Sequence, residues 1–259
     1  MTVADAIIAI AIGAGAGVLS GIFGVGGGIV MTPAIDAFLP VTSIQAIATP
    51  LPVIVPTSIT GAYTYAKAGQ VDRRAAWWMA PAGLVGSVLG ALATQWIDPT
   101  LLLLVTAGLL GWQSIGIIRG GRAQVATGSE TPGPEIPRTT FGVIGFAAGV
   151  VSGLLGIGGG IIMVPLLAGW CGMPLKRALG TSLLTIWALV IPGTVVHAWL
   201  GNIDWWVALF LTIGAVPGAR LGALVALSAQ ERLLRTVVGS GMLVIAVLYA
   251  AAQLVQLTR

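Results

Sequence analysis

The chain consists of long apolar runs separated by short clusters of polar and charged residues. Residues 6–35 and 139–175, for example, contain no Asp, Glu, Lys or Arg. Such runs exceed the roughly 20 residues that cross a bilayer core as a helix. They are continuously apolar, whereas the strands of a membrane barrel alternate between apolar and polar positions. The pattern therefore predicts an all-α, polytopic helical membrane protein.

Ten apolar segments are predicted, and they divide evenly between the two halves of the chain. A Gly-rich turn separates the first two segments of each half, so those helices are expected to be broken or re-entrant. The segments are 3–22, 28–39, 44–66, 75–96 and 100–118, then 140–155, 159–171, 178–199, 205–227 and 236–255.

An internal repeat relates the two halves. Sliding the chain against itself by 132 residues aligns SGIFGVGGGIVMTP at 20–33 with SGLLGIGGGIIMVP at 152–165, without a gap. Because the first segment recurs deep inside the chain and lacks a basic start, we interpret it as part of the fold and not as a signal peptide.

The repeat also divides the chain into parts. We expect a first transmembrane repeat at 1–118, an exposed linker with Gly, Pro and polar residues at 119–138, and a second repeat at 139–259. The two repeats would form one pseudo-symmetric transport domain.

The basic loops predict the orientation of the repeats. Basic residues follow the third and fifth segments of the first half, but precede the third and follow the fourth segments of the second half. Because basic loops stay in the cytoplasm, equivalent loops lie on opposite sides, and the repeats have inverted topology with both termini external. The loops expected in the cytoplasm are 67–74, 119–138, 172–177 and 228–235.

Composition limits the chemistry. The chain is 57% hydrophobic and 8% charged, with a formal net charge of +4. In a membrane protein this charge describes loops and indicates no nucleic-acid partner. One cysteine, Cys171, and one histidine, His197, exclude an internal disulfide and a multi-histidine or cysteine metal site, so no metal or cofactor is expected. The expected partners are the lipid bilayer and a small anion. The sequence does not determine the oligomeric state, and a homodimer is one possible assembly.

The two glycine blocks are the main candidate site. Three adjacent glycines strongly favour a helix break, and the helix that follows would present free N–H groups and a positive dipole end to an anion. Close packing of helices is the alternative explanation. The predicted substrate-binding glycines are Gly26, Gly27, Gly28, Gly158, Gly159 and Gly160.

Hydroxyl and charged side chains are further candidates for contact with the substrate. Thr49, Thr181 and Ser182 lie at the starts of the third segments, beside helix loosened by proline, although such hydroxyls also join helices. Arg220 lies within an apolar segment and is a candidate counter-charge for the anion, or else extends to the cytoplasmic edge. His197 is a candidate proton carrier or gate, or a structural hydrogen-bonding residue.

Two other residue types have structural explanations. Asp72 and Asp204 each precede an apolar segment, where helix N-capping accounts for both. The tryptophans mostly flank the loops, as in the aromatic belts of membrane proteins.

Three features carry a resemblance to a known family. They are the duplicated Gly-x-Gly-Gly-Gly-x-x-x-x-Pro block, the sequence VPGARLG at 216–222, and the His-x-x-x-Gly-Asn-Ile-Asp-Trp sequence at 197–205. Together they resemble the TauE/SafE family of sulfite and organosulfonate exporters over nearly the whole chain outside the linker. The resemblance implies an inner-membrane permease for small sulfur-containing anions, such as sulfite or sulfoacetate.

Two other functions are compatible with some of these residues. A passive anion channel would also use broken helices and their dipole ends. An intramembrane serine protease would use Ser152 and His197, but the usual Gly-x-Ser-Gly spacing is absent, and Ser20 repeats Ser152 in a half without histidine. We therefore predict a secondary transporter with alternating access and no catalytic residues.

Overall fold

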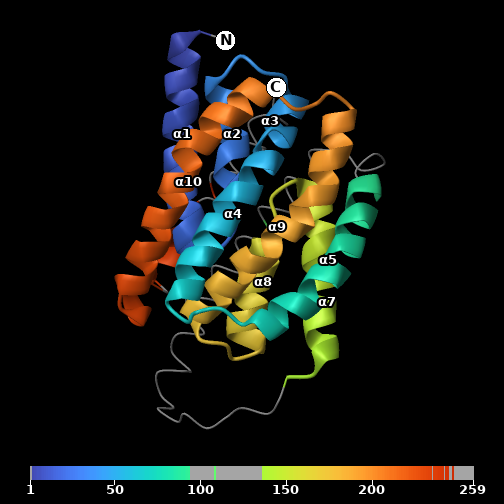
Figure 1. Cartoon of the computed structure of the whole chain (residues 1–259), viewed down its shortest axis with the longest axis vertical. Coiled ribbons are helices and arrows are strands. Elements are labelled where there is room, and N and C mark those ends of the chain that lie inside the picture. Colours follow the sequence, from blue (N-terminus) through green and yellow to red (C-terminus); the bar gives the residue numbers. More distant parts are fainter. Residues whose placement is uncertain are drawn as a thin grey trace.

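The computed structural model describes residues 2–93, 108, 136–234, 236–241, 243, 244 and 247. These residues contain helices and no β-strand (Figure 1), which confirms the predicted all-α class. The elements are α1 (Val3–Phe23), α2 (Gly28–Phe38), α3 (Ser43–Ala48), α4 (Pro50–Lys67), α5 (Arg73–Ala93), α7 (Arg138–Leu155), α8 (Gly160–Pro165), the π-helical turn η2 (Leu166–Trp170), α9 (Leu175–Trp199) and α10 (Trp205–Ser228).

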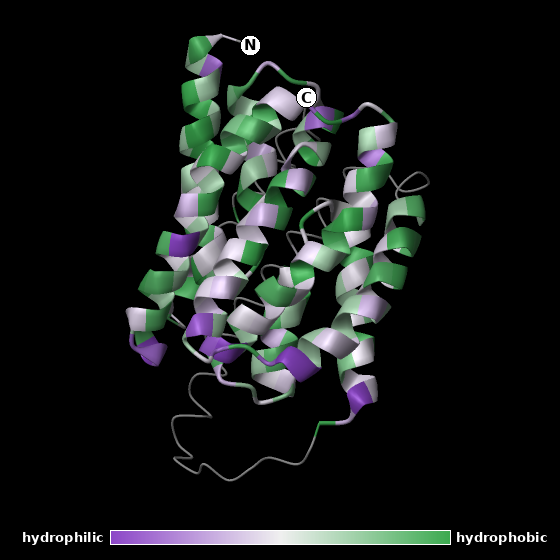
Figure 2. Cartoon of the chain, in the orientation of Figure 1, coloured by the Kyte–Doolittle hydropathy of each residue, from purple (hydrophilic) through white to green (hydrophobic). Residues whose placement is uncertain are grey.

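Five helical stretches in the described part are long and apolar enough to cross a membrane. They are Val3–Phe23, Ile44–Lys67, Arg73–Ala93, Leu175–Trp199 and Trp205–Ser228. Hydrophobic residues dominate along the helices, and hydrophilic ones gather towards their ends (Figure 2). This distribution is the one expected of a polytopic membrane protein.

Parts of the sequence prediction fall outside the described residues. The predicted segment 100–118 does so except for Gly108, and the predicted segment 236–255 does so except for 236–241, 243, 244 and 247. Most of the predicted linker 119–138 lies outside as well. The other predicted segments correspond to helices whose bounds differ by a few residues.

Two close helix pairs flank a central pair. α4 and α9 lie in the middle, with α1 and α10 on one side and α5 and α7 on the other (Figure 1). Glycine permits both close pairs: a Cβ at Gly17 of α1 would overlap the Ala215 carbonyl oxygen of α10, and one at Gly149 of α7 would overlap the Gly83 carbonyl oxygen of α5. Small residues therefore let the backbones touch.

These two interfaces are related by the repeat. Advancing Gly17 by 132 residues gives Gly149, and moving Ala215 back by 132 gives Gly83. Moreover, α1 begins at one end of the bundle and α7 begins at the other (Figure 1). The halves thus exchange equivalent contacts. Their orientation in a membrane stays a prediction.

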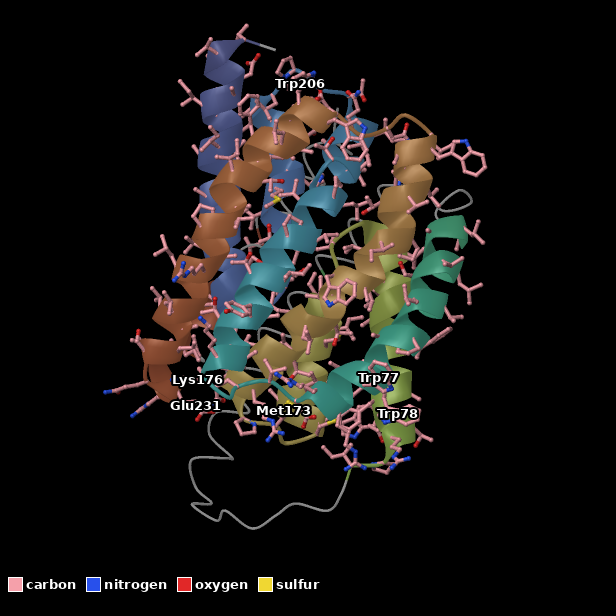
Figure 3. The ribbon with its side chains drawn as sticks, in the orientation of Figure 1. Trp77, Trp78, Met173, Lys176, Trp206 and Glu231 are labelled. Atoms are coloured by element: carbon pink, nitrogen blue, oxygen red, sulfur yellow. The ribbon has the colours of Figure 1, made fainter. Side chains whose placement is uncertain are left out.

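The ends of the bundle have the predicted caps and aromatic residues. The Asp204 carboxylate accepts hydrogen bonds from the Trp206 and Val207 N–H groups, and the Asp72 carboxylate accepts one from the Ala75 N–H. The predicted N-caps are therefore confirmed. Trp77 lies at one end of the bundle and Trp206 at the other (Figure 3), and both side chains are exposed.

The end that carries Trp77 also carries charged residues. Lys176 and Glu231 lie there (Figure 3), and the Lys176 Nζ donates a hydrogen bond to the Leu227 carbonyl oxygen at 2.6 Å. Arg177 forms an ion pair with Asp72 at the same end. This end gathers residues from three of the loops expected in the cytoplasm, 67–74, 172–177 and 228–235.

Candidate functional site

Each half contains a break between two helices, and glycine is needed to make it. α1 ends at Gly24 with φ 70°, and α2 begins after Gly27 with φ 87°. In the second half, Gly156 and Gly159 have φ 66° and 71°. L side chains rarely adopt these left-handed conformations. No side chain caps the first turn of α2, which leaves the polar end of that helix to other partners.

The structure brings the two breaks into contact. A Cβ built on Gly28 would lie 3.3 Å from the Gly156 carbonyl oxygen, and one built on Gly160 would lie 2.7 Å from the Val25 Cα. All these residues are buried. Of the predicted glycines, Gly26, Gly28, Gly158 and Gly160 therefore form one buried cluster to which both halves contribute. Gly27 and Gly159 lie next to them in the chain and are buried against Ala16 and Ala148 of their own halves.

The central helices surround this cluster with apolar groups. A Cβ on Gly26 would lie 3.0 Å from the Ile54 Cγ2 and 3.2 Å from the Ile186 Cγ2. The same two isoleucines lie 3.6 Å and 3.1 Å from a Cβ on Gly158. Ile54 and Ile186 are repeat mates, so each half supplies one of them. One polar side chain also reaches the cluster, because the Ser182 Oγ donates a hydrogen bond to the Gly24 carbonyl oxygen at 2.9 Å.

The two predicted threonines lie at opposite ends of the bundle. The Thr49 Oγ1 accepts a hydrogen bond from the Asp204 N–H at 3.2 Å, next to the end that carries Trp206. The Thr181 Oγ1 accepts one from the Asp72 N–H at 2.8 Å, at the other end, and donates to the Arg177 carbonyl oxygen. The structure therefore does not bring the two hydroxyls together. They join the halves at two separate places.

Arg220 and His197 also lie away from the breaks. Arg220 is on the exposed side of α10, whereas the buried side of that helix is formed mainly by Ala and Gly facing α1. No ion pair or hydrogen bond of its side chain is present among the described residues. His197 is half-buried in the last turn of α9, with its Nδ1 3.3 Å from the Asn202 Nδ2. Neither residue is among the nearest neighbours of a glycine in the cluster.

A pair of serines also belongs to the breaks, although no sequence pattern predicted them as site residues. In the described part of the chain, the buried polar side chains are those of Ser and Thr residues and of Tyr65, and none is charged. Among these, the hydroxyls of Ser20 and Ser152 have no hydrogen-bond partner. Each is 2% exposed. They are the first residues of the aligned glycine blocks, and this shared position was the available signal. The described residues contain no group of three or more His, Cys, Asp or Glu side chains placed to hold a metal.

A polytopic helical bundle with a buried, charge-free meeting point of broken helices is typical of membrane transporters. The sequence profile of the TauE/SafE sulfite exporter family matches residues 9–249. The chain belongs to this family, and it is a multi-pass membrane protein of a transporter family.

Individual relatives agree with this class. The chain is 32% identical over 251 residues to a probable membrane transporter protein of Xylella fastidiosa, covering 95% of each chain. It is 29% identical over 237 residues to the probable membrane transporter protein YunE of Bacillus subtilis, covering 84% of this chain and 87% of the relative. A shorter match, 37% identical over 75 residues, covers 27% of this chain and 15% of TauE/SafE family protein 3 of Arabidopsis thaliana, a sulfite exporter by name. No solved structure matches the chain significantly.

Proposed function

We propose that the protein is a secondary transporter that moves a small sulfur-containing anion, such as sulfite or an organosulfonate, across the inner membrane. The observation that carries this proposal is the contact between the two glycine breaks, at Gly28 and Gly156 and again at Gly160 and Val25. A site shared by two halves can be reached from either side if the halves move relative to each other.

The helix that follows the first break supports an anion as the substrate. α2 has 11 residues and begins at Gly28 within the cluster, without a side-chain cap. Its N-terminus carries a partial positive charge of about half a unit. Helix N-termini bind oxyanions elsewhere through their N–H groups and their dipole. The family's description as sulfite exporters makes a sulfur oxyanion the first substrate to test.

The contacts between the halves support alternating access. The Asp72–Thr181 hydrogen bond joins them at one end and the Asp204–Thr49 hydrogen bond joins them at the other. A transporter of this kind would break one contact at a time, so that the glycine cluster opens to one side only. A passive channel, the alternative, would require both ends to open together.

The structure gives less support to an intramembrane protease. The Ser152 hydroxyl has no partner, and the His197 ring lies beside Asn202 in the last turn of α9. A serine nucleophile needs a base within hydrogen-bond reach. The relatives described above are named as transporters.

Binding and flux measurements on the purified full chain test the proposal. Sulfite, sulfate, thiosulfate and two-carbon sulfonates would be screened by thermal shift in detergent, followed by uptake into proteoliposomes. We expect at least one of these anions to stabilise the protein and to enter the vesicles at a saturable rate. Currents at channel rates would favour the alternative, and the absence of both binding and flux for every anion would refute the proposal.

A pair of glycine variants tests where the anion binds. Gly27→Ala adds a methyl group at the start of α2, where its Cβ would lie 3.3 Å from the Ala16 carbonyl oxygen. Gly201→Ala is the matched control, because Gly201 has a similar φ of 71° but nothing within 4 Å of an added Cβ. Both variants have the same left-handed backbone strain. We expect Gly27→Ala to lose uptake while the folded control retains it.

A further inference from the structure

Ser20 and Ser152 differ from the other buried hydroxyl side chains of the described residues because they have no hydrogen-bond partner. The hydroxyls of Thr57, Thr185 and Thr212 each donate to the carbonyl oxygen four residues earlier, and that of Ser58 donates to the one three residues earlier. Such a bond is open to almost any serine or threonine inside a helix. A buried hydroxyl without a partner is unfavourable, because it has lost its hydrogen bonds to water and gained none in return. Two of them at equivalent positions of a repeat therefore require an explanation.

The position of Ser20 supplies an explanation for its unpartnered hydroxyl. Its Cβ lies 3.4 Å from the place that a Gly27 Cβ would occupy, so the serine stands against the residue that precedes α2. Its own carbonyl oxygen accepts the hydrogen bond from the Gly24 N–H that ends α1. The serine with the unpartnered hydroxyl is thus next to the start of an 11-residue helix that has no side-chain cap. Ser152 holds the same place in the second half, one turn before Gly156.

The charge of the surroundings limits what these hydroxyls can bind. The buried polar side chains of the described residues are the neutral hydroxyls of Ser, Thr and Tyr65, and the basic side chain within α10, Arg220, is exposed. An anion at the breaks would therefore be held by neutral donors and by the partial charge of the α2 N-terminus. The energy needed to remove an ion from water rises with the square of its charge, so such a site suits one negative charge better than two.

From these observations we infer that Ser20 and Ser152 donate hydrogen bonds to a monovalent oxyanion bound at the two glycine breaks, and that the site disfavours divalent oxyanions. This inference rests on the proposed function and specifies the ligands and the charge class of its substrate.

Methanesulfonate and sulfate form a matched pair of probes. They have nearly the same tetrahedral shape, but one carries a single charge and the other two. Affinity for each would be measured by titration against the purified full chain in detergent, at constant ionic strength. We expect methanesulfonate to bind the wild-type protein at least about tenfold more tightly than sulfate. Equal or tighter binding of sulfate would overturn the charge assignment.

Serine variants test the ligands. Losing a hydrogen bond to a charged group weakens binding by about tenfold or more. We therefore expect a loss of that size for Ser20→Ala and a larger one for Ser20→Ala with Ser152→Ala. Ser58→Ala is the control, because Ser58 is buried and already bonded to the Val55 carbonyl oxygen. We expect the control to bind as the wild type does.

Stability without the anion separates binding from packing. Removing an unpartnered hydroxyl removes a buried polar group, so the anion-free Ser20→Ala protein should melt at or above the wild-type temperature. A lower melting temperature together with unchanged affinity would overturn the ligand assignment. If the double variant takes up the anion with wild-type affinity, the serine inference fails while the proposed function stands. If the wild type neither binds nor moves any of the anions, the proposed function fails, and this inference with it.

Discussion

Equivalent hydrogen bonds join the two halves of the chain at the two ends of the bundle, but the two ends differ in charge. At the end near Trp77, the Asp72 N–H donates to the Thr181 Oγ1 at 2.8 Å. At the end near Trp206, the Asp204 N–H donates to the Thr49 Oγ1 at 3.2 Å. Each bond joins one half of the chain to the other. The repeat thus supplies the same contact twice, once at each end.

The difference in charge comes from a residue that the two halves do not share, Arg177. Arg177 forms an ion pair with Asp72, with its Nη2 2.9 Å from the Asp72 Oδ2. The repeat mate of Arg177 is Gln45, whose side chain accepts a hydrogen bond from the Thr42 N–H within its own half. The shared residues therefore build the scaffold, and the unshared ones make the two ends unequal. We expect the two ends to open with different free energies.

The largest expected effect concerns the side of the membrane that each end faces. Ala68 and Leu200 are exposed repeat mates just after α4 and α9. With Cys171→Ser as the background, Ala68→Cys and Leu200→Cys would each be treated with a membrane-impermeant thiol reagent in oriented vesicles. We expect all-or-none labelling from opposite sides, because the repeats are proposed to be inverted. Labelling of both from the same side would contradict the inverted topology.

The next effect tests whether the two close helix pairs are equivalent. Gly17→Leu and Gly149→Leu should each destabilise the fold by about 3 kcal/mol or more, because the added side chain would overlap a backbone carbonyl of the facing helix. The control is Gly15→Leu, since nothing lies within 4 Å of an added Cβ there. Gel filtration and thermal unfolding in detergent would measure the loss. If only one of the two variants were damaged, the equivalence of the interfaces would be wrong.

A smaller effect separates the two cross-half hydrogen bonds. Thr181→Val and Thr49→Val keep the side-chain shape and remove the hydroxyl that accepts the Asp N–H. Each should lower the free energy of unfolding by about 0.6–1.7 kcal/mol, the range for interhelical hydrogen bonds in membranes. Thr181→Val should have the larger effect, because its bond is shorter and the hydroxyl also bonds Arg177. The reverse order, measured by thermal unfolding in detergent, would refute this ranking.

The smallest effect belongs to the ion pair. Arg177→Gln and Asp72→Asn remove its charges, and Asn still caps α5. Because the Arg177 side chain is 46% exposed, the coupling in a double-mutant cycle should be only about 0.2–1 kcal/mol. It should shrink further in high salt. A coupling that did not change with salt would mean that the pair is not screened by water as its exposure implies.

Several properties of the fold could be predicted from the sequence. Apolar runs of membrane-spanning length determined that the chain is helical and polytopic, because a backbone in lipid must satisfy its own hydrogen bonds. The gapless repeat and its triple glycines determined where helices break in both halves, because several adjacent glycines disfavour a continuous helix. The caps at Asp72 and Asp204 followed from local sequence as well, because a cap bonds residues two or three positions away.

The partners of the hydroxyl side chains were decided by the tertiary structure. Thr49 and Thr181 lie at the predicted starts of the third segments, yet they bond residues 155 and 109 positions away, at opposite ends of the bundle. Local sequence carries no information on such distant contacts. The packing of α10 against α1 likewise turned Arg220 outward, because its small residues face the partner helix. Packing also left Ser20 and Ser152 buried without hydrogen-bond partners. This could be recognised only from the positions of all neighbouring donors and acceptors, which the tertiary structure determines.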